Sequence, residues 1–246
     1  MRKTILLTAI VATCMMMNTS CKKTETNNNT DSTAVAANKV EEIAEEPKCE
    51  FESLDLQTFN LHGKVKRVET YWGDNDKTDD VLEFDEHGRL YIMTAQSFEG
   101  PVEETFNYST ATGFEGEFNE LEGGYASMNM QRDEQHRLTH TCCQTFMYDD
   151  EGRLKSYETT GWEASTEYTD FTFDDKGNIL TATYNGDGEG MEWQGNTTYK
   201  YTAFDEHGNW TSCEITEVGS YQNFDEEPGS AETTESSKRR VITYYK

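Results

Sequence analysis

Polar and apolar residues alternate along most of the chain after residue 50, with the period of two that is typical of β-strands. The alternation is clear at 180–184 and 241–245, and Thr, Tyr, Phe, Val and Trp dominate the whole region. We predict strands over 64–72, 79–86, 89–98, 102–109, 124–132, 137–148, 153–160, 165–174, 178–185, 196–205, 209–218 and 238–245. The acidic segment 224–237 is expected to be a long exposed loop. About 190 ordered residues suffice for one core, so a single β domain over 51–246 is expected.

A seven-residue pattern separates several of these strands. Its copies are FDEHGRL at 84–90, RDEQHRL at 132–138, YDDEGRL at 148–154, FDDKGNI at 173–179 and FDEHGNW at 204–210. Each copy carries an Asp whose carboxylate can accept N–H groups inside a type I turn. Three residues later a Gly can adopt the left-handed conformation that leads through a bulge into the next strand. The turn residues are Asp85, Gly88, Asp149, Gly152, Asp174, Gly177, Asp205 and Gly208, whereas the second copy has His136 in the glycine place.

These heptads resemble the YD repeat, also called the RHS repeat, over roughly residues 61–246. The resemblance implies an antiparallel meander of consecutive β-hairpins that forms one long, twisted and curved sheet, either open or partly rolled. The giant members of the family coil this sheet into a shell around a toxin. Five unevenly spaced copies are too few for such a shell, and no toxin module follows them, so the resemblance supports the fold more than a function.

The first twenty residues have the features of a secretion signal. Arg2 and Lys3 form a basic start, and an apolar run follows that is too short to span a membrane. Cys21 stands where a bacterial lipoprotein signal would be cut and its cysteine lipidated. Asn18 departs from the Leu-like residue that is usual three places before that cysteine, and Cys14 is the alternative. We therefore predict a signal peptide over 1–20, and a lipidated Cys21 with its tether over 21–50.

The tether and the charge of the chain bear on location and partners. Residues 22–48 contain too few bulky apolar residues to fold alone, although a short helix over 34–46 is compatible with their composition. We expect a lipid anchor in the outer membrane of a Gram-negative cell envelope, on a side that the sequence does not assign. The net charge of −26 argues against nucleic acid as a partner and disfavours direct contact with anionic lipid. A solvated acidic surface is the preferred interpretation of this charge, and attraction of divalent cations or basic partners is the alternative.

The segment NGDGEG at 185–190 begins like a calcium loop, with Asn185, Asp187 and Glu189 alternating before a glycine. Its twelfth position is Asn196 where a bidentate Glu would be needed, and helices do not flank it. A glycine-rich hairpin loop is the preferred interpretation, so no metal and no cofactor are predicted.

Four cysteines follow the proposed export signal, and an oxidising compartment favours disulfide bonds among them. The candidates are Cys49, Cys142, Cys143 and Cys213, whose three pairings the sequence cannot tell apart. Adjacent residues of a strand point to opposite faces, so Cys142 and Cys143 should not pair with each other. A metal or thiol site at His140 and Cys142, near His136, is the weaker alternative because further ligands are not identifiable.

No nucleophile elbow, phosphate loop or metalloprotease helix occurs, and no catalytic residue is predicted. The preferred function is a non-enzymatic cell-envelope lipoprotein that presents its sheet to a protein or a glycan. Aromatic side chains could stack on sugar rings, although core packing is their more common use. The alternatives are a secreted hydrolase that uses two carboxylates, and a fragment of an RHS-type toxin system.

Overall fold

The computed structural model describes residues 51–246 except 77, 79, 98–99, 120–129, 142, 151, 162–163 and 224–228. Its elements are α1 (Leu54–Thr58), β1 (Val65–Trp72), β2 (Asp80–Phe84), β3 (Leu90–Ser97), β4 (Gly100–Tyr108), β5 (Gly116–Asn119), β6 (Gln131–Arg132), β7 (Leu138–Thr141), β8 (Gln144–Tyr148), β9 (Leu154–Gly161), β10 (Ala164–Phe173), β11 (Ile179–Gly188), β12 (Met191–Phe204), β13 (Trp210–Asn223) and β14 (Glu232–Tyr244).

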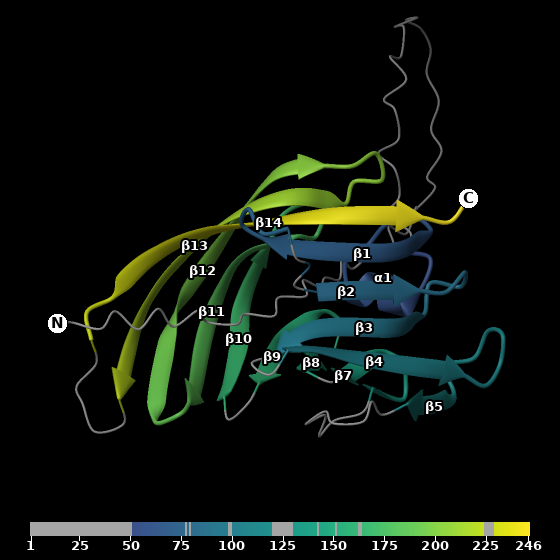
Figure 1. Ribbon diagram of the computed structural model, residues 1–246, viewed down its shortest axis with the longest axis horizontal. Helices are drawn as coiled ribbons and strands as arrows, with labels where there is room; N and C mark the ends of the chain where they lie inside the picture. The colour runs from purple at the N-terminus through teal and green to yellow at the C-terminus, as the bar shows by residue number, and fades with distance from the viewer. Residues whose placement is uncertain are drawn as a thin grey trace, which may run out of the picture.

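The described strands form one antiparallel sheet, so the expected all-β class and antiparallel arrangement are confirmed (Figure 1). The order along the sheet is β5-β4-β3-β2-β1-β14-β13-β12-β11-β10-β9-β8-β7-β6. Neighbouring strands are consecutive in the chain except in the middle, where β1 pairs with β14. In that pair Val65 lies opposite Tyr244 and Trp72 lies opposite Lys238. The first and last strands of the domain therefore meet in the centre of the sheet.

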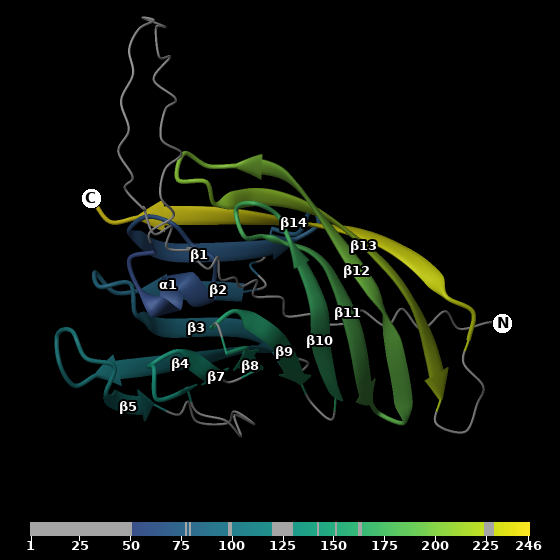
Figure 2. The same ribbon diagram turned by 180° about the vertical axis from the view of Figure 1, so that it is seen from behind.

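The sheet is partly rolled around helix α1. One ring of the segment that follows the helix, Phe59, contacts Phe84 of β2 at a centroid distance of 5.9 Å and Phe146 of β8 at 6.5 Å. These two strands are far apart in the sheet order but face the same short segment. From this rolled part, β10–β13 sweep away from β1–β5, as both views show (Figures 1 and 2).

The short helix is held by both of its ends. Ser53 caps the N-terminus, because its Oγ accepts the N–H of Leu56 at 3.1 Å. At the C-terminus Asn60 has φ +47°, and Leu61 N donates to Leu56 O at 2.8 Å in a Schellman arrangement. Leu56, Phe59 and Leu61 are fully buried and join the strand residues in one hydrophobic core.

The heptads form the hairpin turns that the sequence predicts. In the first copy, Asp85 Oδ1 accepts the N–H groups of His87 at 2.9 Å and Arg89 at 3.0 Å. The glycines have positive φ in every complete copy: +74° at Gly88, +79° at Gly152, +81° at Gly177 and +87° at Gly208.

His136, the residue that replaces glycine in the second copy, also has a positive φ of +65°. Asp133 there accepts N–H groups just as Asp85 does, so the copy keeps the geometry despite the substitution.

In the complete copies other than the last, the residue that opens the strand after the glycine has a role that the sequence reasoning missed. Arg89 Nε donates to Asp85 Oδ2 at 2.8 Å, and Arg153 Nε contacts Asp149 in the same way at 2.7 Å. Asn178 replaces the arginine in a later copy, and its Nδ2 donates to Asp174 at 2.9 Å. The side chain thus closes the loop by binding the carboxylate that organises its backbone.

Several predicted boundaries are wrong. Residues 137–148 contain two strands, because β7 ends at Thr141 and pairs antiparallel with β8, which begins at Gln144. The segment NGDGEG is not a loop: β11 continues to Gly188, and only Glu189 and Gly190 form the turn. The C-terminal part of the predicted acidic loop is also strand, since β14 begins at Glu232. Helix α1 and strand β5 were not predicted.

Candidate functional site

The sheet has two faces along β9–β13, and strand alternation separates their side chains. One face, the core face, carries Tyr157, Tyr168 and Tyr184, which are buried. The other, the outer face, carries a hollow of about 500 Å³ that we call the polar hollow. Its lining residues are Glu158, Ser165, Glu167, Asn185, Gly186, Asp187, Glu192, Trp193, Gln194, Ser220 and Gln222.

The register places the side chains of the polar hollow in two rows that cross the strands. The first row runs from β9 to β13 through Glu158, Glu167, Asn185, Gln194 and Ser220, each directly opposite the next. Adjacent strands are about 4.8 Å apart, so this row is roughly 19 Å long.

The second row runs from β10 to β13 and contains Ser165, Asp187, Glu192 and Gln222. Every side chain of the two rows ends in a hydroxyl, an amide or a carboxylate.

The glycine and the tryptophan of the lining belong to the floor of the polar hollow. Trp193 lies opposite Gly186, and its indole is directed to the core face, where Nε1 donates to Thr166 Oγ1 at 3.0 Å. A Cβ on Gly186 would be 2.1 Å from Trp193 Nε1, so only glycine allows the indole to lie across this position. Because side chains alternate between the two faces of a strand, only the backbone of these two residues faces the polar hollow.

Few contacts occupy the polar groups of the hollow. Gln222 Nε2 donates to Glu192 Oε2 at 2.5 Å, and Ser165 Oγ lies 3.4 Å from Asp187 Oδ1. Among the described residues, Arg and Lys form no ion pair with the four carboxylates of the lining. The polar hollow therefore presents hydrogen-bonding groups and negative charge to solvent.

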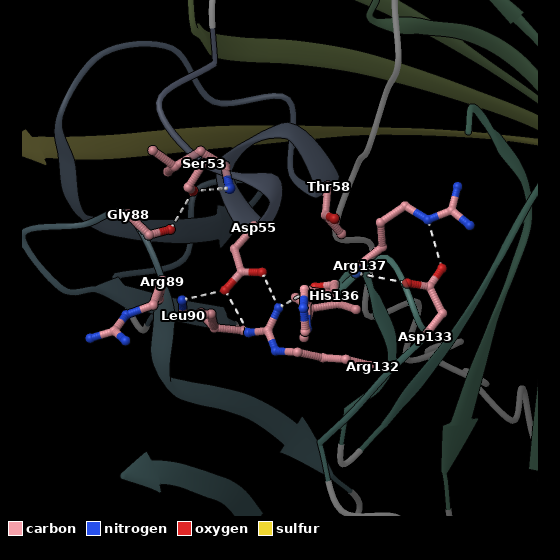
Figure 3. A network of polar contacts seen from close by, with 12 residues as sticks. Ser53, Asp55, Thr58, Gly88, Arg89, Leu90, Arg132, Asp133, His136 and Arg137 are labelled. Atoms are coloured by element: carbon pink, nitrogen blue, oxygen red, sulfur yellow. Dashed lines mark hydrogen bonds and ion pairs between the residues drawn. The ribbon is translucent and has the colours of Figure 1, made fainter. Parts of the chain in front are cut away.

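A second polar cluster lies inside the roll and joins its two ends (Figure 3). Asp55 of α1, which is fully buried, receives two hydrogen bonds from Arg132 of β6 at 2.6 and 2.8 Å. Its Oδ2 also accepts the N–H of Leu90 in β3 at 2.7 Å. Arg132 further donates to the hydroxyl of Tyr108 in β4 at 2.9 Å. All four groups are used in holding the sheet, and the cluster is structural.

The weak metal candidates do not form a site. Asn185 and Asp187 lie on the outer face in the polar hollow, whereas Glu189 is in the turn beyond it with φ +49°. In the described part of the chain, no three His, Cys, Asp or Glu side chains gather closely enough to hold a metal ion. His140 contacts Thr139 Oγ1 at 3.1 Å through Nδ1, and Cys142 lies outside the described residues.

The disulfide prediction is wrong for Cys213, which is a buried free thiol. It lies in the middle of β13, where the residues directly opposite it are Tyr201 on β12 and Lys238 on β14. Neither of these is a cysteine with which it could form a disulfide bond. Burial raises the pKa of its thiol to about 11. Cys143 is half-buried in the turn between β7 and β8 and is not bonded to Cys213.

Cys49 and the proposed lipidation site Cys21 lie outside the described residues. No helix in the described part of the chain is long and apolar enough to cross a membrane.

Comparisons with known proteins give little. No family model matches the sequence. No curated protein matches it either. A crystal structure described as a porin-like protein from Bacteroides uniformis ATCC 8492 aligns with 73% of this chain and 98% of its own, at 14% identity and a TM-score of 0.33.

Proposed function

We propose that this protein is a non-enzymatic, lipid-anchored protein of the cell envelope that binds a glycan in the polar hollow. The observation that carries the proposal is the pair of polar rows across β9–β13. Amides both donate and accept hydrogen bonds, hydroxyls do the same, and carboxylates accept. A ligand with hydroxyls along its length can use every group of such rows.

The same rows are a poor match for a protein partner. Protein interfaces take most of their binding energy from aromatic, aliphatic and arginine anchors that fill apolar pockets. The side chains that line the polar hollow provide no such pocket, since Trp193 is turned to the core face. The strands that carry the rows are interior to the sheet and paired on both sides, so a peptide cannot add to them as a further strand.

The anchor remains part of the proposal. Lipidation at Cys21, followed by a tether up to residue 50, would hold the folded domain at the outer membrane and leave the sheet accessible. Replacing Cys21 with Ser should release the protein from the membrane fraction and abolish its labelling by a fatty-acid analogue. If the wild-type protein carries no acyl label, the anchor is at another residue or does not exist.

We also propose that the hairpins are of the YD type, on the basis of their turns. Each Asp organises the loop backbone and each left-handed Gly completes the turn, and in the complete copies other than the last the side chain of the following Arg or Asn binds the Asp. This repeat would supply a rigid frame for the glycan site. It gives no support to a toxin system.

A glycan array followed by calorimetry tests the binding function. Gln194→Ala removes a donor and an acceptor from the first row and should weaken binding at least about fivefold, since one such hydrogen bond contributes about 1 kcal/mol. The matched control is Asn196→Ala, on the same face of β12 but outside the lining of the polar hollow, and it should leave the affinity unchanged. Equal losses in both variants would place the site elsewhere.

Hydrolysis is tested in the same samples. The bound glycan should be recovered intact by mass spectrometry after long incubation. Shortened products that disappear in a single carboxylate variant would replace the binding function with the hydrolase alternative.

A further inference from the structure

The charges of the polar hollow point to a narrower class of ligand. We propose that its glycan carries amino groups, so that the site binds a cationic rather than a neutral or acidic polysaccharide. This inference rests on the proposed glycan-binding function and names the ligand of that same site.

The first observation is the cross-strand pairing of like charges. Glu158 of β9 lies directly opposite Glu167 of β10, and Asp187 of β11 lies directly opposite Glu192 of β12. Side chains in such positions have Cβ atoms about 5 Å apart, and like charges there destabilise a sheet. Both pairs line the polar hollow.

The second observation is that the rest of the sheet avoids this arrangement. Among the described strand positions, the directly opposed pairs with two charges outside the polar hollow are Arg67 with Glu83 and Lys200 with Glu214. Both are attractive and form salt bridges. Among the described strand positions, the repulsive pairs are thus confined to the polar hollow.

A bound cation would convert the repulsion into attraction. An ammonium group has three donors and no acceptor, so one such group can bridge two opposed carboxylates. A metal ion fits less well, because the described residues bring no three potential ligands together. Since the rows also contain Asn185, Gln194 and Gln222, hydroxyls of the same ligand find partners between the two charged pairs.

Two glycans of equal length test the inference directly. The hexamer of β-1,4-linked glucosamine carries amino groups, and its fully N-acetylated counterpart has none. Calorimetry at a pH slightly below neutral should show the glucosamine hexamer binding at least tenfold more tightly than the acetylated hexamer. The preference should shrink as salt is added, because salt screens the carboxylates.

Two substitutions test whether the charge of the carboxylates, rather than their size, determines the affinity for the cationic glycan. Glu167→Gln and Glu192→Gln each keep the size of the side chain but remove one of the two negative charges of a repulsive pair. Each should weaken binding of the glucosamine hexamer several-fold, leave that of the acetylated hexamer nearly unchanged, and raise the thermal midpoint of the free protein. Glu235→Gln, on the exposed part of β14 outside the polar hollow, is the control and should change neither affinity.

The outcomes distinguish this inference from the function on which it rests. Equal affinity for the two hexamers would overturn the cationic preference and leave the glycan site standing. Preference for an acidic glycan such as polygalacturonate would do the same. Binding of hexalysine with no binding of either hexamer would overturn both, in favour of a basic peptide. Binding of none of these probes would also overturn both.

Discussion

Removing the charge of Asp55 should destabilise the contact between the two ends of the rolled sheet. Asp55→Asn keeps the shape of the side chain but leaves the Arg132 guanidinium, whose side chain is only 9% exposed, without its counterion. Breaking a buried ion pair by removing one partner costs about 3–5 kcal/mol, because a charge stays buried without compensation. For a domain of this size that corresponds to a fall in the thermal midpoint on the order of 10 °C.

A double-mutant cycle shows whether the loss comes from the pair. Arg132→Met should cost a similar amount, since it leaves the Asp55 carboxylate buried with the N–H of Leu90 as its remaining partner. The double variant Asp55→Asn with Arg132→Met should lose clearly less than the sum of the single losses, because no charge remains to be compensated.

The assay is urea unfolding followed by tryptophan fluorescence. Lys200→Gln is the control, because it breaks an ion pair whose side chains are 73% and 58% exposed, and the midpoint should not move. A loss below about 1 kcal/mol for Asp55→Asn would refute the reasoning, since the charge of Arg132 would then not be buried in solution.

Three further results are expected. Gly208→Ala should lower the free energy of unfolding by about 1 kcal/mol through its positive φ alone. Gly88→Ala should lower it clearly more, because the new Cβ would also lie 2.7 Å from Ser53 Oγ, and equal losses would contradict this account. Burial raises the pKa of Tyr148 to about 12 in the folded protein, from the ordinary value of 10.0 that applies in the unfolded chain. The stability that this neutral tyrosine contributes is therefore complete below pH 10 and is lost as the pH rises towards 12. Tyr148→Phe should flatten this alkaline fall in the urea midpoint, and an unchanged profile would assign the fall to other groups. Cys213 should resist maleimide in the native protein and react after denaturation, and rapid native labelling would contradict its burial.

The turns were predictable because their chemistry is local. An Asp and a Gly three residues apart specify a hairpin end without reference to the rest of the chain, and the structure has positive φ at Gly88, Gly152, Gly177 and Gly208. The strand boundaries near 188 and 232 were missed because Gly and acidic residues are poor strand formers on average. There the neighbouring strands override local preference, since β11 to β14 pair along that whole extension.

The polar hollow could not be predicted for a different reason. Its first row joins residues from 158 to 220, and they become neighbours only through the register of five strands. A one-residue slip of any of these strands would turn the side chains that it contributes to the rows towards the core face. The signal available in the sequence was the acidic and amide-rich character of 185–194, of which we interpreted 185–190 as a hairpin loop.

The pairing of β1 with β14 has a consequence for the time at which the chain can fold. Val65 and Tyr244 are opposite each other in the centre of the sheet, so the two halves cannot join until the last strand has left the ribosome. Contacts of such long separation form late, because much chain entropy is lost before they are made. The consecutive hairpins on either side can form earlier, but the sheet is completed only after β14 has been synthesised.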